Sequence, residues 1–103
     1  MGIHEPKVYA GLDEMAIYER VSRHGHTAQR VVEEPGVLRE VNKSDCDLVL
    51  AFVAGSADVR IGAEVFHVVS GDKLNIPGGR PHSTLVGEYG VLYYVTQVEG
   101  CTD

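Results

Sequence analysis

Turn-forming residues interrupt this chain at short, fairly even intervals, and this spacing restricts the possible folds more than any other feature. The breaks contain Gly, Pro, Asp and Ser, which favour turns because glycine tolerates unusual backbone angles and proline cannot donate a backbone hydrogen bond. They fall at positions 25, 35–36, 55–56, 62–63, 70–72, 77–79 and 87. The segments between them are short and rich in Val, Ile, Leu, Phe and Tyr. This pattern predicts an all-β barrel or sandwich of short strands.

Six of these segments are expected strands: 30–32, 48–53, 57–61, 65–69, 74–76 and 91–98. The segment 57–61 alternates apolar with charged residues, as a half-buried strand does, whereas 48–54 is apolar throughout. We expect Gly55 and Ser56 to join these two segments as a tight hairpin. Residues 10–22 have rough helical spacing, and Asp13 and Glu14 suit a first helical turn, although a strand fits nearly as well.

The chain is acidic: 9 Lys and Arg residues stand against 15 Asp and Glu residues, for a formal net charge of −6. Such a domain repels the phosphates of nucleic acids and anionic membrane surfaces, so neither is an expected partner. No segment approaches the ~20 apolar residues of a membrane span, and the N-terminus lacks the pattern of a signal peptide. We therefore expect one cytoplasmic domain over residues 1–103.

The two cysteines, Cys46 and Cys101, are too few for a disulfide framework. We expect both to be free thiols in a reducing compartment, with a disulfide between them as the alternative. Asp45 and Asp47 flank Cys46 and oppose ionisation of its thiol, so we expect this cysteine to be unreactive.

The segment 71–82 contains four residues at a distinctive spacing: Gly71, Pro77, Gly79 and His82. The first glycine suits a turn into a strand, the proline ends that strand, and the second glycine permits a sharp reversal before the histidine. This spacing resembles the second motif of the cupin family, although the Asn usual at position 86 is Val here. The resemblance implies a single cupin-type β-barrel, a jelly roll or double-stranded β-helix, with its core at residues 30–98.

The first cupin motif normally precedes the second and supplies two His and one Glu as metal ligands. Its framing glycines match Gly36 and Gly55, whereas its three ligand positions hold Asn42, Ser44 and Leu48. A transition-metal centre depends on imidazole and carboxylate donors, which these positions lack. We therefore expect no cofactor in this barrel.

A divalent metal remains the minor alternative. Of the family's usual ligands only His82 is present, and one imidazole does not hold a transition metal alone. If a metal binds, we expect it at His82 together with His24 and His26, the one His-x-His pair in the chain.

The expected ligand-binding residues are Glu40, Asn42, Ser44, Arg80 and His82. His82 is expected to line a pocket in the barrel, with a purely structural histidine as the alternative. The first three share one strand parity and are expected to face the interior, or else to meet water at the barrel mouth. Arg80 lies at the rim, where a guanidinium suits a carboxylate or phosphate.

Tyr93 and Tyr94 are expected on opposite faces of one strand, and we expect Tyr94 to be the inward one. His67, in the expected strand 65–69, is expected to be structural or exposed.

We arrive at four functional hypotheses. The first is a metal-free cupin that binds a small organic molecule, such as a sugar, an organic acid or another metabolite, near His82. The second is an isomerase or epimerase that uses His82 with Tyr94 or Glu40 as an acid/base pair. The third is a metal-dependent enzyme of the dioxygenase type with a rearranged site, and the fourth a non-catalytic interaction protein. We expect a homodimer, to which 91–98 contributes as an uncovered edge strand.

Overall fold

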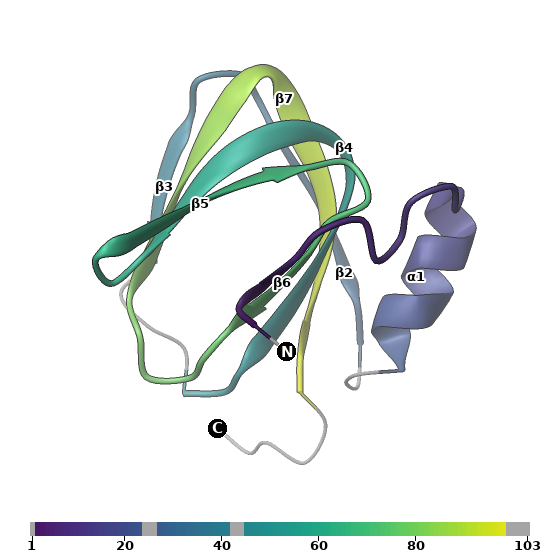
Figure 1. Cartoon of the computed structure of the whole chain (residues 1–103), viewed down its shortest axis with the longest axis horizontal. Coiled ribbons are helices and arrows are strands. Elements are labelled where there is room, and N and C mark those ends of the chain that lie inside the picture. The colour runs from purple at the N-terminus through teal and green to yellow at the C-terminus, as the bar shows by residue number, and fades with distance from the viewer. Residues whose placement is uncertain (1, 24–26, 42–44, 99–103) are drawn as a thin grey trace.

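The computed structural model describes residues 2–23, 27–41 and 45–98. Over these residues seven antiparallel strands curve into a barrel, and one short helix lies outside it (Figure 1). The elements in chain order are β1 (His4–Glu5), α1 (Glu14–Ser22), β2 (Gln29–Glu33), β3 (Leu38–Val41), β4 (Leu48–Ile61), β5 (Glu64–Val69), β6 (Lys73–Ile76) and β7 (His82–Gln97). The all-β barrel predicted from the turn spacing is confirmed.

Two long strands, β4 and β7, pair with each other along most of their length. On its other side β4 pairs with β5 and β6, and β7 pairs with β2 and β3. The part of β7 that begins at Val91 is therefore hydrogen-bonded on both sides, because β2 covers it over residues 91–95. The expectation of an uncovered edge strand at 91–98 is wrong.

Strand β4 continues through Gly55 and Ser56, so the expected tight hairpin is also wrong. Instead, the pairing of β4 with β7 shifts register on either side of Gly55. Gly55 has a φ of 81°, and a Cβ atom there would lie 2.0 Å from the carbonyl oxygen of Gly90. Glycine at this position lets the two strands approach closely at a bulge, which bends the sheet without ending the strand.

The bulges change which side chains face the barrel interior. Along both long strands the interior positions are even-numbered before the bulge and odd-numbered after it. The apolar residues of this interior cluster are Leu48, Leu50, Phe52, Ala57, Val59 and Ile61 from β4 and Val86, Val91, Tyr93 and Val95 from β7. Strand alternation therefore holds on each side of a bulge but not across it.

Helix α1 begins where Asp13 caps it: this side chain accepts a hydrogen bond of 2.9 Å from the backbone N–H of Ala16. The buried side chains of the helix, Ile17 and Val21, pack in a second cluster on the outer faces of β4 and β7. The helical alternative for residues 10–22 is confirmed over a shorter range. The described residues contain no helix with the length and apolar character of a membrane span.

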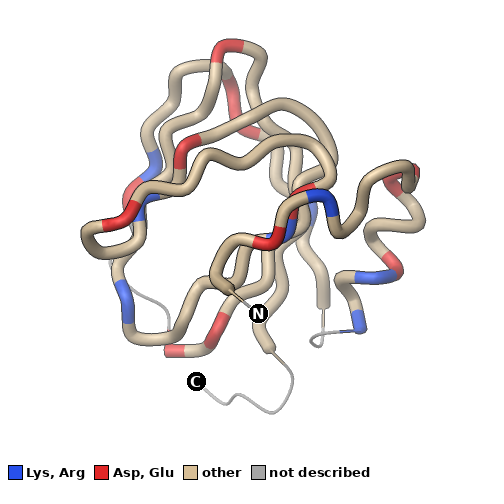
Figure 2. Tube along the Cα trace, viewed as in Figure 1, with Lys and Arg blue, Asp and Glu red and all other residues tan. Residues whose placement is uncertain are grey.

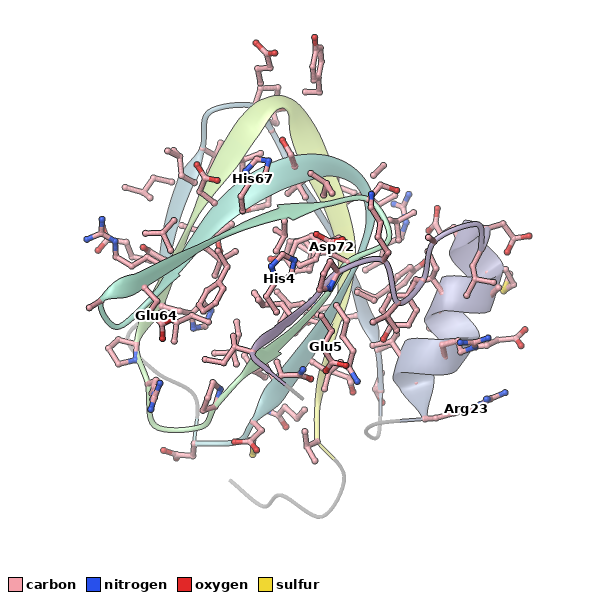
Figure 3. All side chains as sticks on the ribbon, in the orientation of Figure 1. His4, Glu5, Arg23, Glu64, His67 and Asp72 are labelled. Carbon is pink, nitrogen blue, oxygen red and sulfur yellow. The ribbon has the colours of Figure 1, made fainter. Side chains whose placement is uncertain are left out.

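The buried carboxylate of Asp72 fastens the N-terminal segment to the turn between β5 and β6. It accepts hydrogen bonds from the backbone N–H of Val69 at 3.0 Å, the backbone N–H of Lys7 at 3.1 Å and the His4 ring at 2.9 Å. Figure 3 shows His4 and Asp72 close together. Burial alone would raise the pKa of Asp72, but these hydrogen bonds outweigh it and hold the pKa below its usual range.

Cys46, just before β4, is buried and disulfide-bonded. The expectation of a free thiol at Cys46 is therefore wrong. The other cysteine of the chain, Cys101, lies outside the described residues. Because stable disulfides are typical of oxidising compartments, the bond removes one reason for expecting a cytoplasmic protein.

Candidate functional site

The barrel interior contains a cavity of about 350 Å³ with walls from four strands. The lining residues are Val31 and Glu33 from β2, Arg39 from β3, Leu48 and Leu50 from β4, and His82, Thr84, Tyr93 and Val95 from β7. The wall thus combines apolar side chains with a few polar groups. Small-molecule sites typically have this size and this mixed character.

His82 opens strand β7 and lines this cavity, as the sequence predicts. Its Nδ1 atom is buried and has no hydrogen-bond partner among the described residues. Burial lowers the pKa of His82, so the imidazole is neutral near pH 7. A buried polar atom without a partner costs about 1–3 kcal/mol, and a bound molecule that hydrogen-bonds to Nδ1 would remove that cost.

Glu33 and Arg39 form an ion pair at the cavity. The Arg39 guanidinium donates from Nε to one carboxylate oxygen of Glu33 and from Nη2 to the other, the second contact at 3.2 Å. The Glu33 side chain is 9% exposed and the Arg39 side chain 65% exposed. The negative group therefore lies on the inner side of the pair and the positive group on the solvent side.

Tyr93, not Tyr94, lines the cavity, so the expected inward position of Tyr94 is wrong. The Tyr93 ring packs against Phe52 with 5.3 Å between centroids. Tyr94 lies instead beneath α1, where its hydroxyl donates a hydrogen bond of 2.6 Å to Glu14. The reason is the bulge: counting alternate positions from His82 leads to Tyr94, but the register shifts move the interior face to odd numbers.

The expected interior position of Glu40 is wrong as well. Its side chain is exposed, and the register of β3 with β7 pairs Glu40 with Ser83 and Arg39 with Thr84. Because Arg39 and Thr84 line the cavity, the neighbouring Glu40 faces the opposite side of the strand. The other two residues expected on this face, Asn42 and Ser44, lie outside the described residues.

The remaining candidates lie elsewhere. Arg80 is exposed in the turn before β7 and is not among the residues that line the cavity. Asn42, Ser44, His24 and His26 lie outside the described residues. Outside the cavity, His67 is exposed on β5 and contacts Asp58 at 2.7 Å, which agrees with the second of its two expected roles, structural or exposed.

The described lining residues do not fit a transition-metal centre of the usual cupin kind. Leu48 lines the cavity at the position where the cupin pattern has a carboxylate ligand, and it offers no donor. His82 supplies one imidazole, and the carboxylate of Glu33 is already held by Arg39. Within residues 2–23, 27–41 and 45–98 no group of three or more His, Cys, Asp or Glu side chains is placed to hold a metal ion.

Four polar lining residues were not predicted from the sequence to face the cavity: Glu33, Arg39, Thr84 and Tyr93. Residues two apart in a strand lie on the same face, so Glu33 is predicted to share the face of Val31, and Thr84 the face of His82. No comparable signal identifies the ion pair, because Glu33 and Arg39 stand on different strands that each pair with β7. The inward orientation of Tyr93 depends on the bulge, so strand alternation alone does not predict it.

No family model matches the sequence, and no curated protein matches it. Solved structures with a similar fold include a variant of oxalate decarboxylase from Bacillus subtilis, with a TM-score of 0.66 and 26% identity over 74% of this chain and 22% of that one. A conserved protein of unknown function from Streptococcus pyogenes has a TM-score of 0.63 and 21% identity over 73% of this chain and 65% of that one.

A third similar structure is the cupin domain of a transcriptional regulator of the XRE family from Enterobacter cloacae. Its TM-score is 0.61, with 15% identity over 66% of this chain and 75% of the other. The chain therefore has the cupin fold, as its motif spacing predicts. It spans less than two thirds of the length of the Streptococcus and Bacillus proteins.

Proposed function

We propose that this protein binds a small organic molecule in its barrel cavity, in contact with His82, without a metal ion. The observation that supports this most directly is that His82 lines a cavity of about 350 Å³ while its buried Nδ1 has no hydrogen-bond partner among the described residues. A ligand that hydrogen-bonds to this atom gains more than the same contact at an exposed position would give. The apolar walls supply the area that such a ligand buries.

The experiment is a ligand-observed NMR screen of a metabolite library against the whole protein. For each molecule that binds, we expect His82→Leu to weaken affinity about tenfold or more, because it removes the hydrogen-bonding imidazole. The matched control is His67→Leu, which changes an exposed histidine outside the cavity and should leave affinity unchanged. If the ligands bind the His82 variant as well as the wild type, they bind elsewhere and the proposal fails.

An enzyme with acid/base chemistry is the second candidate, favoured by the same imidazole. A neutral imidazole near pH 7 serves as a general base. Burial, and then the negative charge of Glu33, raise the pKa of Tyr93, so its phenol remains protonated and available as an acid in the same cavity. This pair replaces the earlier partners Tyr94 and Glu40, which face away from the cavity.

If a substrate is converted, we expect both His82→Gln and Tyr93→Phe to reduce kcat about a hundredfold or more. Tyr94→Phe is the matched control, since that hydroxyl contacts Glu14 beneath α1 and should not affect turnover. Equal losses in the two tyrosine variants would indicate a structural effect and count against the pair.

We also propose that the protein is a homodimer, and that nucleic acids are not among its partners. Val32, Leu38 and Leu85 leave apolar side chains exposed on the outer faces of β2, β3 and β7, which supports association of the barrel. Acidic and basic positions are mixed around the barrel and along α1, without the uniform sign that nucleic acid requires (Figure 2). Multi-angle light scattering tests the dimer, and a monomer at working concentrations would contradict it.

A further inference from the structure

The charge arrangement at the cavity points to the chemical class of ligand that it accepts. Among the described residues that line the cavity, Arg39 is the single permanently cationic one. An unpaired arginine there would favour a carboxylate or phosphate, because its planar fork binds two oxygens at once. The state of this guanidinium therefore decides whether an organic acid is a suitable ligand.

Glu33 already accepts the two hydrogen bonds through which the Arg39 guanidinium would bind a ligand carboxylate. Its two carboxylate oxygens accept from Nε and Nη2, so the geometry that a ligand carboxylate would use is occupied by a residue of the chain. The Glu33 side chain is 9% exposed, whereas that of Arg39 is 65% exposed. An anion inside the cavity would therefore meet the buried negative charge before the positive one. It would have to displace Glu33, leaving that carboxylate buried and unpaired.

The other polar groups that the structure describes on the cavity wall are uncharged. His82 is neutral near pH 7, Thr84 offers a hydroxyl, and Tyr93 is a protonated phenol. Each of these groups donates or accepts a hydrogen bond without compensating a charge. The apolar walls at Val31 and Leu50 add no counter-charge for an anion.

We propose that the cavity selects uncharged ligands with an apolar body and a hydrogen-bonding group, such as an amide or alcohol, and that Glu33 excludes organic anions by neutralising Arg39. This inference rests on the proposed function, because it specifies the ligand class of the same cavity. The sequence leads us to expect a sugar, an organic acid or another metabolite as ligand. The inference retains only the uncharged molecules among these.

The test uses amide and carboxylate probes with the same skeleton, for example benzamide and benzoate, titrated into the whole protein at pH 7 and followed by NMR. The members of each pair have nearly the same shape and differ in charge. We expect the amides to bind about tenfold or more tightly than the matched carboxylates, because one unpaired charge near Glu33 costs about that much. This comparison needs no variant.

Three variants then locate the source of the selectivity. Glu33→Gln releases the guanidinium of Arg39 and should strengthen carboxylate binding about tenfold, making carboxylates equal to or better than amides. Arg39→Gln leaves Glu33 unpaired and should weaken carboxylates further. The matched control is the double variant with both substitutions, in which the net charge of the pair is again zero and the amide preference should persist.

The outcomes separate this inference from the proposed function. If neither amides nor carboxylates shift the resonances of cavity residues, the inferred preference for uncharged amides is overturned, while ligand binding in the cavity is decided by the metabolite screen with His82→Leu. If probes bind in the cavity but carboxylates match or exceed amides in the wild type, ligand binding stands and the selectivity is overturned. An amide preference that Glu33→Gln leaves unchanged would also overturn the assigned role of Glu33.

Discussion

His82 and Asp72 both have buried polar atoms in this small barrel, but the hydrogen bonding of these atoms differs. The Asp72 carboxylate accepts three hydrogen bonds that fasten the N-terminal segment to the barrel. The Nδ1 of His82 has no partner among the described residues. Because a barrel this small needs most buried polar groups paired, the unpaired one is the stronger indication of a binding site.

The lowered pKa of His82 predicts a pH dependence of stability. Burial disfavours the imidazolium, so below pH ~6.5 the unfolded chain binds the proton more readily than the folded one. The stability from neutral His82 is complete above the unfolded pKa and is lost as pH falls through the folded pKa. In urea unfolding series from about pH 7.5 to about pH 5, wild type should lose more stability than His82→Gln. Parallel curves would contradict this.

Asp72→Asn should lower the free energy of unfolding by about 1–3 kcal/mol near pH 7, because the amide cannot accept all three hydrogen bonds. The pKa of Asp72 is held low in the folded protein, so its contribution is present above the unfolded pKa and is lost as pH falls through the folded pKa. The difference from the variant should therefore shrink in acid. Asp58→Asn, at an exposed pair with His67, is the control and should change stability by less than about 0.5 kcal/mol.

At the scale of elements, the bulges in β4 and β7 determine the site. They allow each strand to bend and supply two parts of the barrel wall, and they reverse which parity faces inward. For this reason Tyr93 lines the cavity, whereas Tyr94 packs in the cluster on the outer face. Helix α1 packs on the outer face of the barrel, the same face on which Tyr94 lies.

Gly55→Ala tests the bulge. A Cβ atom at Gly55 would lie 2.0 Å from the Gly90 carbonyl oxygen, so the two long strands would have to separate. We expect urea unfolding to show a decrease of about 3 kcal/mol or more in the free energy of unfolding. Alanine is strained in the left-handed conformation at this position, and its Cβ atom overpacks the site. Gly62→Ala is the control: Gly62 also has positive φ, at 61°, but nothing lies within 4 Å, so only about 1–2 kcal/mol should be lost. Equal losses would mean that the close approach is unimportant.

At the scale of the whole molecule, two apolar clusters and one covalent bond hold the chain together. The first cluster fills the barrel, and the second joins α1 to its outer face. The disulfide at Cys46 adds a constraint at the start of β4.

Reduction of the disulfide should destabilise the protein by about 2–4 kcal/mol, the usual effect of removing such a bond. Thermal unfolding with and without dithiothreitol measures this, and Cys46→Ser should reproduce the reduced protein without any reductant. The same variant should be insensitive to dithiothreitol. An unchanged Tm for reduced wild type would contradict a stabilising role for the bond.

The sequence by itself predicted the cupin fold and parts of β2, β4, β5, β6 and β7, because turn residues and motif spacing act locally along the chain. It did not predict β1, β3 or the first half of β7. The alternation that locates Thr84 beside His82 is also local. Only the tertiary structure decided that Tyr93 faces inward, that Glu40 faces outward and that Glu33 meets Arg39. A bulge inverts strand parity at a point set by the partner strand, and an ion pair between β2 and β3 exists only once both have paired with β7.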